Sequence, residues 1–435
     1  MLSNEWKYIA GDEFCLKVTD GTHDSPKQSD NGKPLITSKH IKKDEIDFDT
    51  AYLISEHDFN EINKRSKVDQ WDVIISMIGA YCGFCFIESN EEIDYAVKNV
   101  GLFKAGSEAN AKWLYYYLIS PIGKAHLDAV KSGSTQPYIA LGALRSLPIL
   151  VPKKDEVKKE IVRVLDAIDT KIRVNNRINA ELEAMAKTLY DYWFVQFDFP
   201  NAYGKPYKTA GGNMVYNPIL KREIPESWSD GTLEDLGQIV GGSTPSTQKR
   251  ENFTSEGMPW ITPNDLSNNQ GNKFISRGAQ DVSTEGIKNA SLKKYPAGTV
   301  LLSSRAPIGY MAIARNEVTT NQGFKSFVPL KGYSTEFIYY TVKDSIKAIS
   351  QYASGSTFKE ISGGTLKTVK VVLPNAKVPE AFTNRVQPIF FRQMLVEKEN
   401  EQLKQLRDWL LPLLMNGQVT VSAPVEEPSR EVKYG

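Results

Sequence analysis

The tetrapeptide Ser132-Gly133-Ser134-Thr135 occurs a second time as Ser354-Gly355-Ser356-Thr357, 222 residues further along the chain. Three positions after it recur at the same offset: Ile139 and Ile361, Leu144 and Leu366, Pro152 and Pro374. Because these matches follow one another at a single offset, we interpret the chain as an internal duplication.

Two segments upstream of the tetrapeptide extend the duplication. Gly32-Lys-Pro-Leu-Ile-Thr37 matches Gly257-Met-Pro-Trp-Ile-Thr262 at an offset of 225, and Lys98-Asn99-Val-Gly101 matches Thr320-Asn321-Gln-Gly323 at 222. The pair Tyr116-Tyr117 matches Tyr339-Tyr340 at 223. The small drift in offset indicates short insertions within one unit that the chain uses twice.

Length and composition bound the class of protein. A chain of 435 residues and 48.7 kDa predicts two or three domains, and 41% hydrophobic with 24% charged residues is typical of globular cores. The net charge of +1 means that any attraction to nucleic acid or membrane must be local. No apolar run could span a membrane, and residues 1–13 lack the pattern of a secretion signal. Cys15, Cys82 and Cys85 are too few for a disulfide framework, which favours a soluble cytoplasmic protein.

Each copy divides into a globular part and a long helix. Residues 1–152 contain short β-rich runs such as Val73–Ile75 and Phe84–Ile87, and an amphipathic segment from Ala111 to Val130 that predicts one helix. We therefore predict two similar α+β domains, each followed by a long helix. The predicted boundaries are a first domain at 1–152, a first helix at 153–195, a linker and second domain at 196–374, a second helix at 375–416 and a flexible C-terminal tail at 417–435.

Both helical segments carry a heptad pattern, in which spacings of four and three residues alternate. The residues predicted in this seam are Ile161, Leu165, Ile168, Ile172, Asn175, Asn179, Leu182, Leu189, Phe382, Val386, Ile389, Val396, Asn400, Leu403 and Leu410. Ala186 and Gln393 also fit the pattern, and Leu406 and Leu414 continue it after a slip. Asparagine in a seam costs stability but fixes register and partner. We therefore predict that the two helices pair with one another; the alternative is that each packs only on its own domain.

The segment between the copies is rich in aromatic residues. It runs Tyr192-Trp-Phe-Val-Gln-Phe-Asp-Phe-Pro-Asn201, Gly204-Lys-Pro-Tyr-Lys208, Gly211-Gly212, Val215-Tyr-Asn-Pro218 and Lys221-Arg-Glu-Ile-Pro-Glu-Ser-Trp228. Further motifs are Asp20-Gly-Thr-His-Asp24, Gly241-Gly-Ser-Thr-Pro245, Trp260-Ile-Thr-Pro263 and the paired Ser-Gly-Ser-Thr. In this order, from about Trp6 to Gly417, the sequence closely resembles the specificity (S) subunit of type I restriction-modification enzymes.

This resemblance implies two α+β target recognition domains and two long helices that pair as an antiparallel coiled coil with approximate two-fold symmetry. It implies a non-catalytic subunit that reads one half of a split double-stranded DNA target with each domain. It further implies that the helices set the spacing of the half-sites and dock two methyltransferase subunits, and that restriction (translocase and nuclease) subunits join the complex. S-adenosylmethionine, ATP and magnesium are then expected on the partner subunits, and no cofactor on this chain.

We find no catalytic or metal-binding pattern that outweighs an ordinary surface or core role. The sequence has no GxxxxGK[ST] loop for ATP and no GxGxxG turn opening a helix. Asn217-Pro-Ile-Leu220 lacks the second proline and the aromatic residue of the adenine methyltransferase motif. Carboxylate-x-lysine triplets lie at termini or on a helix, where solvated charge is expected, and Cys82 and Cys85 lack further ligands for zinc. We therefore predict that the chain is not an enzyme and holds no metal.

DNA contacts are predicted on loops of both domains. Residues 1–152 hold 16 Lys/Arg and 21 Asp/Glu, whereas residues 199–374 hold 20 and 14, so the first domain alone should bind a polyanion poorly. Polar and basic side chains on loops commonly read bases. The predicted base-contacting residues are Thr22, His23, Lys39, His40, Tyr81 and Gln136 in the first domain, and Ser243, Thr244, Asn264, Ser304, Arg305, Gln322 and Lys359 in the second. Ser134 and Ser356 belong to a motif kept in both copies and are predicted to contact the DNA backbone.

Two other classes of function stay open on the sequence alone. A coiled-coil scaffold for protein partners, without base readout, is compatible with the nearly neutral charge. A self-sufficient restriction and methylation enzyme would need cofactor and nuclease motifs that the sequence lacks.

Overall fold

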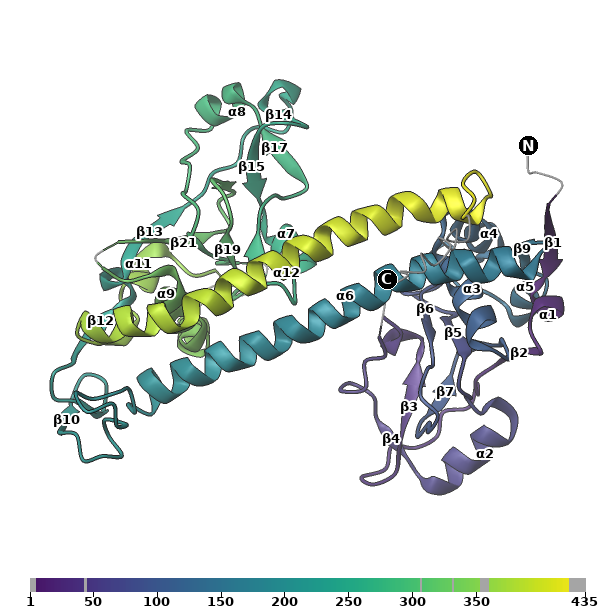
Figure 1. Cartoon of the computed structure of the whole chain (residues 1–435), viewed down its shortest axis with the longest axis horizontal. Coiled ribbons are helices and arrows are strands. Elements are labelled where there is room, and N and C mark those ends of the chain that lie inside the picture. Colours follow the sequence, from purple (N-terminus) through teal and green to yellow (C-terminus); the bar gives the residue numbers. More distant parts are fainter. Residues whose placement is uncertain (1–4, 43–44, 306, 331, 353–359, 422–435) are drawn as a thin grey trace, which may run out of the picture. The chain divides into compact units, whose positions relative to one another are not determined.

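A computed structural model describes residues 5–42, 45–305, 307–330, 332–352 and 360–421. By its internal contacts the chain divides into two units. Unit 1 holds the residues up to Ile172 and those from Gln402 onward, and unit 2 holds Arg173–Glu401. Each unit therefore contains one globular domain, one part of the first long helix and one part of the second (Figure 1).

The domain of unit 1 combines an antiparallel sheet, a mixed sheet and a strand pair with short helices. Its strands are β1 (Trp6–Ala10), β2 (Lys17–Asp20), β3 (Lys33–Thr37), β4 (Leu53–Ile54), β5 (Asp72–Ser76), β6 (Cys85–Ile87), β7 (Ala96–Lys98), β8 (Val100–Lys104) and β9 (Pro148–Pro152). Its helices are α1 (Gly11–Phe14), the 3-10 helix η1 (Ser38–His40), α2 (Glu56–Ser66), α3 (Glu108–Ile119), α4 (Pro121–Val130) and α5 (Leu141–Arg145). Strands β2-β8-β5-β6 form one sheet, β4-β3-β7 a second, and β1 pairs with β9.

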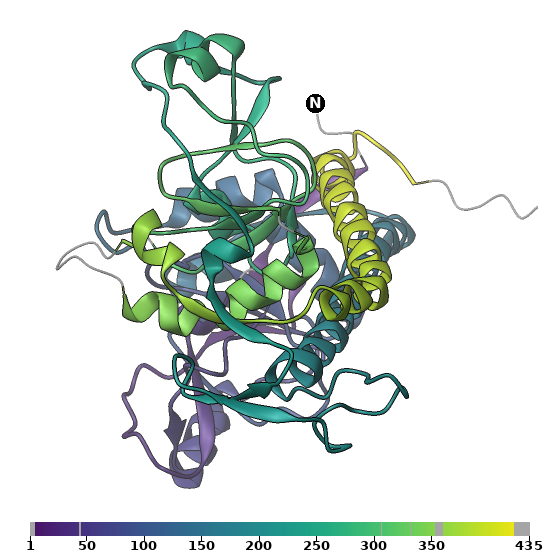
Figure 2. The same cartoon turned by 90° about the vertical axis from the view of Figure 1, so that its left-hand side faces the viewer.

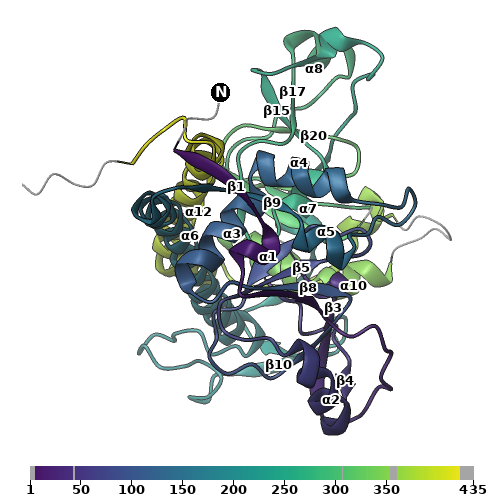
Figure 3. The same cartoon turned by 90° about the vertical axis from the view of Figure 1, so that its right-hand side faces the viewer.

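The core of this domain lies between α3 and the β2-β8-β5-β6 sheet. Trp113 and Tyr117 of α3 are fully buried together with Phe103 of β8 and Val73 of β5. Strands β3 and β4 and helix α2 lie toward the opposite end of the domain from α4 (Figure 3). Strand β3 pairs with β7 in parallel, which brings the ends of these two strands to one edge.

The domain of unit 2 contains β10 (Met214–Asn217), β11 (Arg222–Pro225), β12 (Ser229–Thr232), β13 (Gly237–Gly241), β14 (Phe253–Thr254), β15 (Met258–Ile261), β16 (Phe274–Ile275), β17 (Gln280–Val282), β18 (Val300–Leu302), β19 (Met311–Ala314), β20 (Thr319–Thr320), β21 (Lys325–Pro329) and β22 (Lys370–Leu373). Its helices are η3 (Leu233–Asp235), η4 (Arg250–Asn252), α7 (Pro263–Asn268), α8 (Thr284–Asn289), α9 (Thr335–Asp344), α10 (Ile346–Gln351) and α11 (Gly363–Lys367). Strands β14, β15 and β17 and helix α8 stand out from the rest of the unit as a lobe (Figure 2).

The two domains repeat one topology, which confirms the predicted duplication. Sheet β13-β21-β18-β19-β16 corresponds to β2-β8-β5-β6, pair β12-β22 corresponds to β1-β9, and β15 pairs with β20 in parallel as β3 does with β7. Helix α9 carries two adjacent buried tyrosines, Tyr339 and Tyr340, as α3 carries Tyr116 and Tyr117. The predicted α+β fold class is therefore correct.

The segment from Ala111 to Val130 differs from its prediction as one helix. It forms α3 and α4, which meet at Ser120. The Ser120 hydroxyl accepts a hydrogen bond from the backbone N–H of Gly123 at 3.2 Å and caps α4. Pro121 is the first residue of α4, where its missing N–H costs nothing.

The two long helices are α6 (Asp155–Tyr190), which continues into a π-helical turn at Asp191–Val195, and α12 (Lys377–Met415). In unit 1, Arg407 Nη1 of α12 lies 2.9 Å from Asp169 Oδ1 of α6. In unit 2, Asn175 Nδ2 of α6 donates to Asn400 Oδ1 of α12 at 2.9 Å, and Gln393 Nε2 donates to the carbonyl oxygen of Asn179 at 3.3 Å. Residues later in α6 contact residues earlier in α12, so the two helices run antiparallel.

The seam follows the predicted heptads over most of its length. Residues buried as predicted are Ile161, Leu165, Ile168, Ile172, Asn175, Asn179, Phe382, Val386, Val396 and Asn400. Residues that are half-buried are Leu182, Leu189, Ile389, Leu403 and Leu410. The placement of Leu406 in the seam was wrong: its side chain is 44% exposed, and Arg407 lies in the interface instead, because Asp169 pairs with its guanidinium.

None of the described helices is both long and apolar enough to cross a membrane.

Candidate nucleic-acid interface

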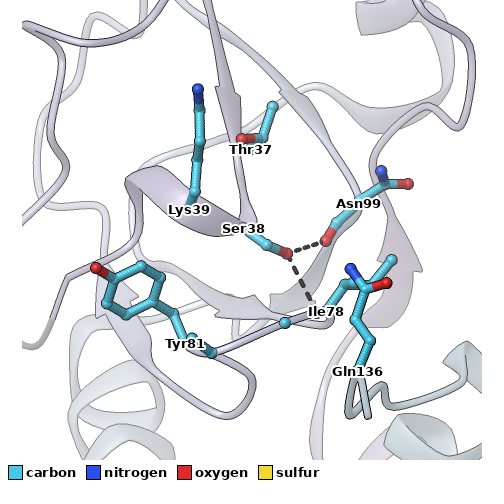
Figure 4. Close-up of a pocket in the computed structure, with 9 residues that line it drawn as sticks. Thr37, Ser38, Lys39, Ile78, Tyr81, Asn99 and Gln136 are labelled. Carbon is cyan, nitrogen blue, oxygen red and sulfur yellow. Dashed lines mark hydrogen bonds between the residues drawn. The ribbon is translucent and has the colours of Figure 1, made fainter. Parts of the chain in front are cut away.

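Three predicted residues of the first domain meet at one pocket. The loops that follow β3 and β5, the turn between β7 and β8, and the loop after α4 enclose a cavity of about 350 Å³. Its lining residues are Thr37, Ser38, Lys39, Ile78, Gly79, Ala80, Tyr81, Asn99 and Gln136. Figure 4 shows Lys39, Tyr81 and Gln136 around Ser38. Lys39 and Gln136 are exposed, so the pocket offers hydrogen-bonding groups to solvent.

Ser38 and Asn99 build this pocket, and the sequence did not predict either. Ser38 Oγ donates to the carbonyl oxygen of Asn99 at 2.5 Å and accepts from the backbone N–H group of Ile78 at 3.3 Å (Figure 4). It also accepts from the backbone N–H group of Met77 at 3.2 Å. One buried hydroxyl thus joins three loops. Asn99 lies in a segment that matched between the two copies, and that match was the only sequence signal for it.

His23 lies next to the pocket through Asn99. Its Nδ1 is 3.0 Å from Asn99 Oδ1, and its Nε2 is 2.9 Å from Asp20 Oδ2. Arg65 Nη2 donates to the other oxygen of Asp20 at 2.9 Å. The exposed imidazole is therefore held in one orientation, as a residue that contacts a ligand should be.

Tyr81 combines an aromatic face with a nearby cation. The ammonium of Lys42 lies 4.3 Å from the centroid of the Tyr81 ring, and the ring of Phe84 packs edge-on at 5.6 Å. An ammonium over an aromatic ring is attracted by the ring quadrupole. This wall of the pocket can therefore offer both apolar surface and positive charge.

Two predicted base readers of the first domain are structural residues instead. His40 is fully buried, and its Nδ1 accepts the backbone N–H of Thr37 at 2.9 Å. Burial lowers the pKa of His40, which keeps the ring neutral and able to accept. Thr22 is also buried, and its hydroxyl accepts from the N–H of Asp24 at 3.1 Å to form a turn. Neither side chain faces solvent, so their prediction as base contacts was wrong.

The second domain brings Thr244 and Gln322 together. The hydroxyl of Thr244 donates to Gln322 Oε1, and both residues are exposed. The neighbouring Ser243 is half-buried, and its carbonyl oxygen accepts from Trp260 Nε1 at 3.1 Å. Gly21 lies against Val97 of β7, and Gly242 lies against Thr320 of β20, the corresponding strand of the second domain. Ser243, Thr244 and Gln322 therefore occupy the positions that Thr22, His23 and Asn99 hold in the first domain.

The remaining predicted residues have different surroundings. Asn264 is exposed in the first turn of α7, and Arg305 is half-buried with its Nη1 3.7 Å from Glu360 Oε2. Ser304 is buried and its N–H donates to the carbonyl of Gly323 at 2.8 Å, so its prediction as a base reader was wrong. Ser134 is exposed but does not line the pocket. Ser356 and Lys359 lie outside the described residues.

One backbone framework carries these loops in both domains. Thr37 with His40 and Thr262 with Asp265 form the same capping box, 225 residues apart. The N–H of Ile139 donates to the carbonyl of Met77 at 2.9 Å, and that of Ile361 to the carbonyl of Ser304 at 3.0 Å. Lys39 is therefore equivalent to Asn264, and Ile78 to Arg305. The register of the parallel strand pairs makes Val97 equivalent to Thr320, because Val97 pairs with Ile36 and Thr320 with Ile261. The sequence match had paired Lys98 with Thr320, one residue away.

Residues 4–184 and 225–405 each match the type I restriction modification DNA specificity domain. The chain belongs to this family. Each match covers one globular domain and most of the long helix that follows it. The domains are thus the two target recognition domains of a DNA specificity subunit, a class of subunit known for recognition and not for catalysis.

Individual specificity subunits are similar to this chain over different lengths. The specificity subunit of the type I restriction enzyme HindI from Haemophilus influenzae is 27% identical over 411 residues, which cover 82% of this chain and 88% of that protein. The subunit of MjaIX from Methanocaldococcus jannaschii is 40% identical over 198 residues, 45% of this chain and less than half (44%) of that relative. The S subunit of a type I system from M. genitalium shares the fold, with a TM-score of 0.56, 14% identity and coverage of 95% and 96% of the two chains.

The cysteines of this specificity subunit are core residues. Cys15, Cys82 and Cys85 are free thiols, all buried in the first recognition domain. Burial raises the pKa of Cys15 to about 12 and also raises the pKa of Cys82. Among the described residues, no group of three or more His, Cys, Asp or Glu side chains is placed to hold a metal ion.

Proposed function

We propose that each recognition domain reads one half of a bipartite double-stranded DNA target. The observation that carries this proposal is the shared framework with different side chains at equivalent positions, such as Lys39 against Asn264 and Ile78 against Arg305. Lysine and arginine favour the O6 and N7 atoms of guanine, whereas asparagine favours adenine. A common framework with different donors is suited to reading two different half-sites, which a scaffold without base readout would not need.

Exchange of one domain should change one half-site only. We expect a chain whose residues 1–152 come from another family member to recognise a new first half-site and the original second one, because the two recognition domains lie in different units and the pocket of the first is lined by residues of that domain alone. The measurement is selection of binding sites from a random DNA library, with the methyltransferase partner present. The matched control replaces residues 199–374 and should change the other half-site. A change in both half-sites after a single exchange would show that the domains do not read independently.

The partner surface that we propose lies on α12, on the side opposite the seam. Phe391 and Leu395 are exposed in unit 2, and Leu406 and Trp409 are exposed in unit 1. Helical spacing places all four within one stripe, about half a turn from Val396 and Asn400. Large apolar side chains left in solvent mark interaction sites. The occupants proposed here are two methyltransferase subunits, with restriction subunits joining the complex.

We propose that the chemistry lies on those partners, which would bind S-adenosylmethionine, ATP and magnesium. The chain alone should then transfer no methyl group, cleave no DNA and hydrolyse no ATP, and it should support methylation once the methyltransferase subunit is added. Phe391→Ser combined with Trp409→Ser should weaken this complex at least tenfold, because each change removes a large apolar contact. The control is Tyr203→Ser, a still more exposed aromatic residue outside α12. Turnover by the purified chain, or full affinity of the double variant, would contradict the proposal.

A further inference from the structure

Five cations gather on the lobe of the second recognition domain. Lys249 and Arg250 lie at η4, and Lys288, Lys293 and Lys294 lie on α8 and just after it. All five are exposed, and we call this set the basic patch. Its carboxylate neighbours in these elements are Glu251 and Glu285, so the patch keeps an excess of positive charge.

Contacts between η4 and α8 hold the basic patch together. Asn289 Nδ2 donates to Asn252 Oδ1 at 2.8 Å, and the N–H of Ser283 donates to the carbonyl of Asn252 at 3.0 Å. Gly286 lies so close to Asn252 that a Cβ atom there would be 2.2 Å from its carbonyl oxygen. These contacts join the two cation-bearing elements at the tip of the lobe, where Figure 1 shows α8 beside β14, the strand that directly follows η4.

The lobe connects the basic patch directly to the reading loops. Strands β14, β17, β15 and β20 form its sheet, and Trp260 of β15 packs with Val282 and Leu292 in a small core of the lobe. The same Trp260 donates to the carbonyl of Ser243, and β15 runs on into α7 with Asn264. The lobe is thus joined to the loops at Ser243 and Asn264 by a hydrogen bond and by the chain itself.

The first recognition domain has no counterpart of this charge. Residues 24–94 contain 8 Lys/Arg and 15 Asp/Glu, whereas the equivalent residues 247–317 contain 9 and 6. Several cations of the first stretch pair with carboxylates, as in Lys33–Asp94 at 2.6 Å and Lys64–Glu61 at 2.5 Å. In the basic patch, Lys294 lies 3.6 Å from Glu317, and the described part of the chain shows no ion pair for the other four cations.

We propose that the basic patch binds backbone phosphates of the DNA beside the second half-site, so that the two domains hold DNA by different forces. This inference rests on the proposed reading of DNA by both domains. Phosphate contacts supply affinity and orientation but carry no base information. The second domain thus anchors the duplex by charge, and the acidic first domain contributes mainly contacts to base edges through its pocket.

The test measures the salt dependence of binding to a duplex that carries the selected target, using the complex of the full chain with its methyltransferase partner. The variant combines Lys249→Gln, Arg250→Gln, Lys288→Gln and Lys293→Gln. Each phosphate contact contributes about 0.9 to the slope of log K against log salt, so losing four should flatten the slope by about 3 to 4. The selected target sequence should stay the same, because no reading loop was changed.

The matched control replaces Lys7, Lys17, Lys27 and Lys124, which are exposed lysines of the first domain, by glutamine. It removes the same charge and should keep the parent slope. If both variants flatten the slope equally, the effect is one of net charge and the inference is overturned. The inference is also overturned if the basic-patch variant keeps the slope of the parent complex. If the fourfold variant fails to fold, Lys288→Gln with Lys293→Gln should still flatten the slope by about 2. A parent complex without any sequence preference would instead refute the proposed function.

Discussion

Replacing Lys273 by alanine should lower the free energy of unfolding by about 1 to 3 kcal/mol, because it leaves the buried Gln393 Oε1 without its donor and Glu183 with Lys343 as its remaining cation. Lys273 is buried, and its Nζ lies 2.6 Å from Glu183 Oε2 and 2.7 Å from Gln393 Oε1. The ring centroid of Phe390 lies 3.7 Å from the same nitrogen. Within unit 2 this one ammonium thus links the recognition domain to α6 through Glu183 and to α12 through Gln393.

The measurement is denaturant unfolding of the full chain, with Lys293→Ala as the control. Lys293 is exposed in the same unit, and a surface change of this kind should shift stability by less than about 0.5 kcal/mol. We also expect the folded Lys273→Ala variant to bind the second half-site more weakly. The second recognition domain loses the contacts of Lys273 with Glu183 of α6 and with Gln393 of α12. Equal stability of the two variants would show that the buried cation does not stabilise unit 2.

The difference in unfolding free energy between the parent and the Lys273→Ala variant should depend on pH, because Glu183 titrates. Burial raises the pKa of Glu183, but Lys273 and Lys343 together lower it to about 2, below its ordinary 4.5. A carboxyl with a lowered pKa adds stability above pH 4.5, and that stability is lost as the pH falls toward 2. The alanine variant keeps only the part of this contribution that Lys343 supplies. The gap between parent and variant should therefore narrow between pH 4.5 and 2, whereas a gap that stays constant would assign the effect to packing alone.

The helices show how far sequence patterns reach. The heptad spacing selected residues that are buried or half-buried in the structure, because apolar residues that recur every 3.5 residues share one face of a helix. It failed at Leu406, since the seam there holds Arg407, whose charge is satisfied by Asp169 more than two hundred residues earlier. A pattern of apolar residues contains no information about such a distant partner. The same limit applies to Lys273, whose partners lie on both long helices.

The candidate site was predictable in position but not in every residue. Loop polarity selected Lys39, Tyr81 and Gln136 as base contacts, and the structure brings these three side chains to one pocket. Residue type alone cannot distinguish a histidine that faces solvent from one that caps a turn, and His40 was therefore misplaced. A signal for its true role was present: Thr37 and His40 repeat as Thr262 and Asp265 at the spacing of a capping box. Ser38 gave no such signal, because its role depends on three loops that are distant in sequence.

Lengthening both helices by one heptad should lengthen the spacer between the half-sites by about three base pairs. Seven residues extend a helix by about 10 Å, and B-DNA rises about 3.4 Å per base pair. The positions are set by the seam: Asp169 lies opposite Arg407 and Asn175 opposite Asn400. An insertion after Lys171 therefore needs its match after Lys404, at the border of the two units, where it leaves the internal contacts of both intact.

Affinity for the longer site should fall below that of the parent for its own site. A heptad leaves a rotation of only about 20° between the ends of a straight helix, whereas three base pairs turn the duplex by roughly 100°, at 10 to 10.5 base pairs per turn. The two domains would move apart along the DNA without following its twist. Flexing of the loops and bending of the duplex must then absorb the angular mismatch, at a cost in free energy.

The experiment selects binding sites from a library with random spacer length, using the lengthened chain with its methyltransferase partner. Both half-site sequences should be unchanged, because no loop of either recognition domain is altered. A chain with the insertion in α6 alone is the control: it shifts Asn175 relative to Asn400, so it should lose stability and select no defined spacer. Selection of the parent spacer at full affinity by the doubly lengthened chain would mean that α6 and α12 do not set the distance, and the half-sites would have to be positioned by the partner subunits instead.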